Sequence, residues 1–197
     1  MGFGFSASDD DKEEDILSQA QELIHNEINT WGQYRQDIMF EVSEVNHIEH
    51  NLQVCQNYFV SLRKAIEIRT KLVHEFTKQV VEKQNQHINI DHCRNLINHI
   101  ETIHSQIANL MQEIRQTLGF LEVNVNHTLY AQEKNRQRMD AVSKQASALS
   151  VELHTLEDSI RGDINRISQW SDHLNKIAYE RTQKAKKPDQ PFGFNKE

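Results

Sequence analysis

The sequence predicts an all-α fold: an extended coiled coil in three segments, with disordered termini, assembled with partner helices. From Val45 to Val80, apolar residues recur at alternating steps of three and four residues, the period of 3.5 that winds helices around each other. Helix breakers are scarce, because the chain has only six Gly and its two Pro, Pro188 and Pro191, lie in the tail. Aromatic content is 7% and no run of eighteen apolar residues occurs, so neither a large globular core nor a membrane-spanning helix is expected.

Charge and cysteine usage narrow the class of protein further. A net charge of −7 gives no electrostatic reason to expect direct binding of nucleic acid or of anionic lipid. Residues 9–15 are acidic, which does not fit the basic start of a signal peptide. Cys55 and Cys93 fall on apolar seam positions, where a reduced thiol behaves as a small hydrophobe. We therefore expect a reducing compartment and no disulfide.

The first coiled-coil segment is predicted over residues 16–86, after an FG-bearing arm at 1–15 that is too polar and acidic to order itself. Gly32 beside Trp31 and an irregular step before Ile48 predict a bend or a separate short helix before about residue 40. The stretch Val45–Val80 would span roughly 50 Å, which is too long to bury its seam inside a small globular domain, so it calls for partner helices. Apart from Arg69, its seam is apolar: Val45, Ile48, Leu52, Cys55, Phe59, Leu62, Ile66, Val73, Phe76 and Val80.

Two further segments follow, at 90–121 and 127–180. Asn89 or Asp91 is expected to cap the second segment, and Gly119 followed by Phe120 is expected to end it, with a break near 119–127. Asp163, beside Gly162, interrupts the third seam. The second seam comprises Cys93, Leu96, Ile100, Ile103, Ile107, Leu110, Ile114 and Leu121; the third comprises Met139, Val142, Ala146, Leu149, Leu153, Leu156, Ile160, Ile167, Trp170, Leu174 and Ile177. Because the first segment is the longest, we expect pairing between chains in preference to a bundle within one chain.

Each end of the chain carries the same aromatic triplet. Phe3-Gly4-Phe5 lies in the first arm, and Phe192-Gly193-Phe194 lies in a second arm at 181–197. These triplets hold half of the eight Phe of the chain, in segments with almost no other large apolar side chain. Glycine lets the backbone lie against a surface while the neighbouring ring enters a pocket, so we expect both triplets to bind a partner.

The arrangement resembles the coiled-coil FG nucleoporins of the nuclear pore's central channel, especially the sixty-two-kilodalton type subunit. The segment from Leu23 to Glu82, with Trp31, Val45-Asn46, Leu52 and Leu62, is similar to its first coiled-coil segment, and Ala131-Gln132-Glu133-Lys134-Asn135-Arg136 with the following heptads is similar to its last. The resemblance implies a heterotrimer with two other coiled-coil nucleoporins, anchored to a scaffold nucleoporin at the nuclear envelope. It also implies that the FG units are offered to nuclear transport receptors during protein and mRNA transport, without a cofactor.

One departure separates this chain from that family. Its members usually carry a long low-complexity domain with many FG repeats, whereas here one FG unit lies at each end. The chain is therefore either a diverged short member or a region of a longer one.

Three alternatives remain. A di-iron helical-bundle enzyme would use Glu44-x-x-His47 and Glu101-x-x-His104, but these residues lie beside the seams, and the sequence has no recognisable catalytic motif, so we expect no metal and no enzyme. Gly2 and Ser6 match the loose pattern for N-myristoylation, although one acyl chain next to an acidic run binds membranes weakly. A generic tether or a cytoskeletal or membrane-trafficking adaptor would have the same heptads.

Overall fold

The chain folds into an all-helical bundle, described by a computed structural model at residues 9–37, 45–82, 88–131 and 135–186. The described helices are α1 (Asp9–Glu22), the π-helix η1 (Leu23–Glu27), α2 (Ile28–Asp37), α3 (Val45–Thr77), the π-helix η2 (Lys78–Glu82), α4 (Ile90–Ala131) and α5 (Arg136–Lys186). No strand occurs among the described residues. The predicted all-α class is confirmed.

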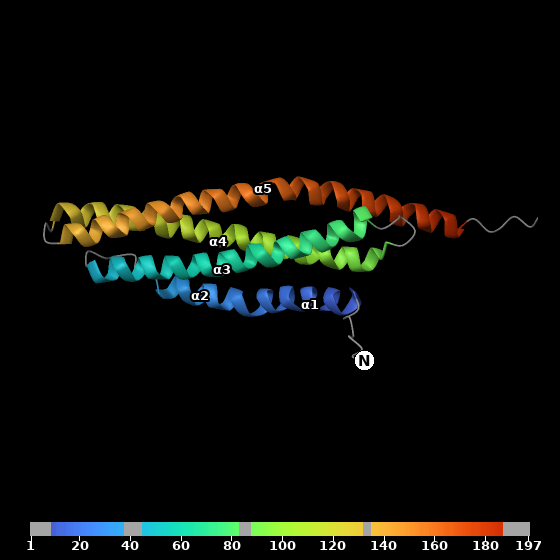
Figure 1. Cartoon of the computed structure of the whole chain (residues 1–197), viewed down its shortest axis with the longest axis horizontal. Helices are drawn as coiled ribbons and strands as arrows, with labels where there is room; N and C mark the ends of the chain where they lie inside the picture. Colours follow the sequence, from blue (N-terminus) through green and yellow to red (C-terminus); the bar gives the residue numbers. More distant parts are fainter. Residues whose placement is uncertain (1–8, 38–44, 83–87, 132–134, 187–197) are drawn as a thin grey trace, which may run out of the picture.

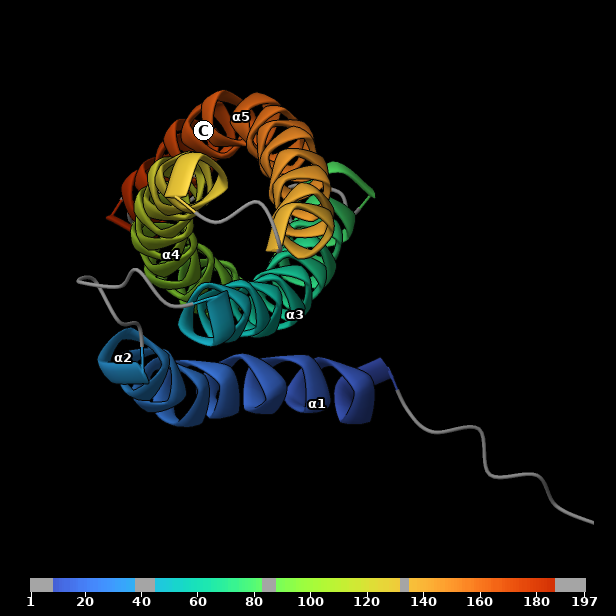
Figure 2. The ribbon, with the colours of Figure 1, turned by 90° about the vertical axis from the view of Figure 1, so that its left-hand side faces the viewer.

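Successive helices run in alternating directions along one long axis (Figure 1). The three long helices α3, α4 and α5 wind around each other, and the N-terminal helix formed by α1, η1 and α2 lies outside them against α3 and α4 (Figures 1 and 2). Because α3 and α5 are separated by one antiparallel helix, they lie parallel to each other and touch directly. The seams predicted from the sequence are thus buried by helices of the same chain.

This burial within one chain differs from the expectation that the seams pair between chains. That expectation assumed a first segment much longer than the other two, but α3 has 33 residues, α4 has 42 and α5 has 51. Helices of comparable length can fold back and cover each other along the whole axis, which leaves no need for an outside helix to bury α3.

Several local features have clear causes in the sequence. Asn89 caps α4 as predicted, because its side-chain Oδ1 accepts from the backbone N–H of His92 at 3.1 Å. The separate helix expected before residue 40 is present as α2, and the π-helix η1 lies between it and α1. On the exposed side of α3, Lys71 and Glu67 form an ion pair at 2.8 Å one turn apart.

The break predicted near 119–127 is wrong, because α4 continues to Ala131. Gly119 does not adopt the left-handed conformation of a helix cap; among the described residues no glycine has a positive φ. Beyond it, Leu121 and Val125 are buried. Burial of these side chains outweighs the helix-breaking tendency of one glycine, which costs about 1 kcal/mol relative to alanine.

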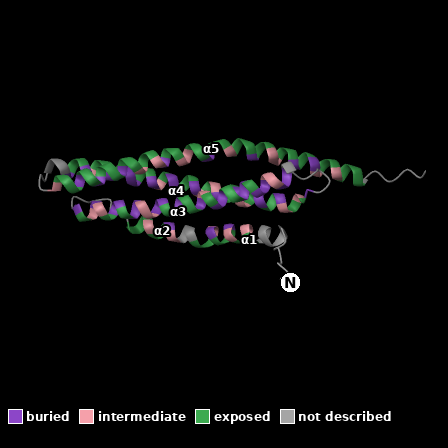
Figure 3. Ribbon diagram, viewed as in Figure 1, coloured by how far each residue is buried: buried purple, intermediate pink, exposed green. Residues whose placement is uncertain are grey.

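Helix α3 is buried on two stripes, whereas α5 is buried mainly on one (Figure 3). Besides the predicted seam, a second stripe at steps of three and four is buried along α3 and its extension η2. The second stripe includes Tyr58, whose ring meets that of Tyr34 in α2 edge to face at 5.3 Å between centroids. Its members are Asn51, Val54, Tyr58, Ser61, Ala65, Ile68, Leu72, Glu75 and Gln79. Helix α3 is therefore the central helix of the bundle.

Candidate functional site

The two predicted receptor-binding triplets, Phe3-Gly4-Phe5 and Phe192-Gly193-Phe194, lie outside the described residues. The same holds for Gly2, the predicted acyl acceptor, and for Glu44 of the di-iron alternative. The structure therefore bears on the helical seams and on the polar groups between them.

The predicted seam residues lie in the interior of the bundle. Most are below a tenth exposed, and four are only partly buried: Ile66, Leu149, Leu156 and Trp170. Three of these four belong to α5, the helix with the largest exposed side (Figure 3). Phe76 of α3 packs on Trp170 with 5.7 Å between ring centroids, which places the first seam of α3 against α5.

A ladder of polar pairs joins the parallel helices α3 and α5. Arg138 holds Glu49 with both Nε and Nη2, at 2.9 and 2.6 Å. Seven residues further along each helix, Gln56 Nε2 donates to Gln145 Oε1 at 3.0 Å. Another seven residues on, Arg63 holds Glu152 with Nε and Nη2 at 2.6 and 2.8 Å. This heptad register is the geometry of two parallel strands of a coiled coil.

The ladder also fixes the charge of its acidic members. The hydrogen bonds from Arg138 lower the pKa of the Glu49 carboxyl, since they favour its ionised form. The bidentate geometry is the one in which guanidinium and carboxylate groups match best. Both pairs lie at the surface, however, so their contribution is mainly to register and less to stability.

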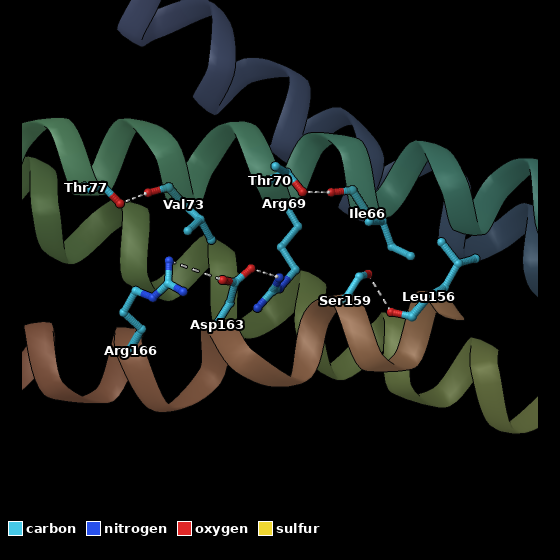
Figure 4. Close-up of polar contacts among 9 residues, drawn as sticks. All are labelled: Ile66, Arg69, Thr70, Val73, Thr77, Leu156, Ser159, Asp163 and Arg166. Carbon is cyan, nitrogen blue, oxygen red and sulfur yellow. Dashed lines mark hydrogen bonds and ion pairs between the residues drawn. The ribbon is translucent and has the colours of Figure 1, made fainter. Parts of the chain in front are cut away.

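Beyond the ladder, the two charged residues that interrupt the apolar seams contact each other. Arg69 reaches from α3 toward α5, and its Nη1 lies 3.3 Å from Asp163 Oδ2 (Figure 4). Arg69 is 1% exposed, whereas Asp163 is partly exposed and lies 3.9 Å from Arg166 as well. Burial lowers the pKa of the Arg69 guanidinium, and the charge of Asp163 opposes that shift.

The remaining donors of Arg69 are unsatisfied within the described structure. Its Nε and Nη2 are buried and have no hydrogen-bond partner. A cavity of about 310 Å³ adjoins this guanidinium, between α4 and α5, and His104 also lines it. Burial, with the nearby charge of Arg69, lowers the pKa of the His104 imidazole and favours its neutral form.

A second concavity lies between α4 and the first half of α5. It has a volume of about 550 Å³, and small side chains of α5, including Ser143, Ser147 and Ser150, form one wall. Arg115 of α4 forms an ion pair with Glu157 of α5 beside it. Large apolar side chains are exposed elsewhere on the helices: Val60, Phe120, Val123, Val151, Ile164 and Tyr179.

The residues of the di-iron alternative do not gather in the described part of the chain. Glu101 and His104 lie on α4 beside the cavity, whereas His47 lies at the start of α3. Among the described residues, no three His, Cys, Asp or Glu side chains are grouped as metal ligands. Within those residues, no helix is long and apolar enough to span a membrane.

Two parts of the interface were missed by sequence reasoning. The second stripe of α3 contains Asn51, Glu75 and Gln79, which are polar residues at buried positions and conceal the period. The ladder was missed because its pairs are 89 residues apart in the sequence. A signal was nevertheless present, since Glu49, Gln56 and Arg63 are themselves spaced by heptads.

Comparisons of the chain with protein-family models, with curated proteins and with solved structures give no significant match.

Proposed function

We propose that this chain is a non-enzymatic structural subunit of the nuclear pore's central channel. In this proposal its helices pack with two other coiled-coil nucleoporins, and a scaffold nucleoporin anchors the assembly at the nuclear envelope. Its FG triplets contact nuclear transport receptors. The observation that carries the proposal is the pair of identical Phe-Gly-Phe triplets at opposite ends of one heptad-patterned helical region.

The helical region suits a structural subunit. The ladder from Glu49–Arg138 to Arg63–Glu152 has the register of a parallel coiled coil, so these helices carry the side chains needed to pair with other helices of the same kind. Helix α5 is the longest described helix and keeps Val151 and Tyr179 exposed. Partner helices would add to that side of the bundle, or exchange with helices of this chain on its seams.

The FG triplets supply the second half of the proposal. A phenylalanine ring that enters a shallow pocket forms a weak contact, and weak contacts exchange quickly. Many tethered copies around one channel then give useful avidity without slow release of any single contact. Phe3, Phe5, Phe192 and Phe194 are the residues assigned to that contact.

The receptor contact is tested by a pull-down with a purified nuclear transport receptor. The full chain is expected to bind, and a variant with all four arm phenylalanines changed to Ser is expected to lose binding while keeping its helical circular dichroism. Phe120→Ser is the matched control, because this phenylalanine is 40% exposed on α4 and lies outside the triplets. Equal binding by the four-serine variant and the full chain would leave a generic tether as the better description.

The assembly is tested separately at the first seam. Phe59 and Leu62 are at most 1% exposed, so Phe59→Asp with Leu62→Asp buries two carboxylates and is expected to abolish association with partner chains. Val60→Asp is the control, since Val60 lies between them on the same helix and is 62% exposed. The seam assignment is wrong if the double variant still co-purifies with the partners of the unchanged protein at the same stoichiometry.

A further inference from the structure

The cavity beside Arg69 combines a buried cation with an apolar wall. Three isoleucines, Ile100, Ile164 and Ile167, line it together with Arg69, Ser168 and His104. Its volume of about 310 Å³ lies at the lower end of the range for small-molecule pockets, roughly 300–1,000 Å³. An apolar lining with a few polar groups is the usual composition of such a pocket.

The free edge of the Arg69 guanidinium specifies the ligand's polar group. Arg63 and Arg138 each hold a carboxylate with the Nε and Nη2 edge. Arg69 uses only Nη1, toward Asp163, and its Nε and Nη2 are buried without a partner. A buried donor without an acceptor is costly, so a carboxylate placed on this edge would gain two charge-assisted hydrogen bonds at once.

The charges around the cavity select for a single negative charge. Asp163 already faces Arg69, and the carboxylates of Glu101 and Asp172 line the cavity. These three acidic groups repel a dianion such as phosphate more strongly than they repel a monoanion. The isoleucines favour a ligand with an apolar body over a fully hydrated ion.

We propose that the cavity formed by Arg69, His104, Ile164, Ile167 and Ser168 binds a small organic monocarboxylate. Its carboxylate pairs with the Nε and Nη2 edge of Arg69, and its apolar body lies along the isoleucines. The cavity is formed by one chain alone, so this binding does not depend on the pore assembly proposed above. A ligand here would bridge α3, α4 and α5 at the level of the Arg69–Asp163 pair and stabilise the bundle.

The experiment uses the full chain and ligand-observed NMR titrations with three probes: benzoate, its neutral analogue benzamide, and inorganic phosphate. Saturable binding of benzoate is expected, with benzamide and phosphate weaker by at least roughly tenfold, the size expected for loss of one charged hydrogen bond. Equal affinity for benzoate and benzamide, binding of phosphate in preference to benzoate, or no binding of benzoate would each overturn the proposal.

Variants locate the site. Arg69→Met keeps an unbranched stem and removes the guanidinium, and Ser168→Phe fills the cavity without changing Arg69; each is expected to weaken benzoate binding at least roughly tenfold. Arg63→Met is the matched control and should bind as the unchanged chain does, because Arg63 already holds Glu152. Circular dichroism verifies that each variant folds. Unchanged benzoate affinity in a folded Arg69→Met or Ser168→Phe protein would contradict the assigned site.

Discussion

Arg69 Nη1 lies 3.3 Å from Asp163 Oδ2, which joins the charged residue in the seam of α3 to the charged residue in the seam of α5. Each residue looks like a defect when its own heptad pattern is considered alone. Together they neutralise each other inside the bundle and fix how α5 lies along α3. This pair is the clearest sign that the two seams are built for one another.

The buried pair makes removal of one partner worse than removal of both. Asp163→Leu leaves Arg69 charged and unpaired, and is expected to lower the free energy of unfolding by about 3–5 kcal/mol. The double variant Arg69→Met with Asp163→Leu should recover to within about 1 kcal/mol of the unchanged protein, or exceed it. Urea denaturation at pH 7 measures all three. If the double variant proves less stable than Asp163→Leu, the two residues are not a pair.

The parallel register of α3 and α5 predicts a crosslink within one chain. Gln56 and Gln145 contact each other at 3.0 Å, so Gln56→Cys with Gln145→Cys should react with a short bifunctional thiol reagent to give a looped single chain. The native thiols will not compete, because Cys55 and Cys93 are buried and burial raises the pKa of Cys55 to about 12.

The control for that crosslink is Gln56→Cys with Lys176→Cys, which places the second thiol far along α5. Mass spectrometry under denaturing conditions separates looped monomers from linked dimers. Exclusively dimeric product from the Gln56 and Gln145 positions would show that the seams pair between chains and not within one.

The hydroxyl of Tyr58 is a buried polar group without a hydrogen-bond partner. Tyr58→Phe is therefore expected to match the unchanged protein at pH 7 or to exceed it in unfolding free energy by up to about 2 kcal/mol. Burial, reinforced by the charge of Glu113, raises the pKa of Tyr58 from 10.0 to about 12. The unfolded chain then releases this proton at lower pH than the folded chain does, so stability falls as the pH rises from 10 to 12.

Tyr58→Phe should reduce that alkaline loss of stability, as measured by urea denaturation between pH 8 and pH 11 (both roughly within the range where the unfolded phenol starts to ionise). Tyr179→Phe is the control, because Tyr179 is 65% exposed, and it should change neither value. A Tyr58→Phe protein with the full alkaline loss would place the effect on other groups.

Gly119 separates the two views of α4 by the sign of one substitution. If this residue ended a helix in a left-handed conformation, Gly119→Ala would strain the backbone and destabilise the protein. In the continuous helix no heavy atom lies within 4 Å of an added Cβ, so Gly119→Ala should raise the unfolding free energy by about 0.5–1 kcal/mol. Gly162→Ala on α5 is expected to behave alike, and thermal unfolding measures both.

Local sequence patterns carry information about single helices but little about their mates. The helical class, the first seam from Val45 to Val80 and the Asn89 cap all follow from neighbouring residues, and the structure has them. The course of α4 past Gly119 depends on burial of Leu121 and Val125 against the rest of the bundle, which no local rule contains. The same applies to the contact between Arg69 and Asp163, because the residues are 94 positions apart.

Capture of the tagged full chain from the cells that express it natively tests the central claim most directly. The stoichiometric partners are expected to be two other chains that combine heptad-patterned helices with FG units, together with a scaffold protein of the nuclear pore, and the Val60→Asp control should recover the same set. Recovery of the chain alone, or with stoichiometric partners from outside the nuclear pore, would contradict the proposed function.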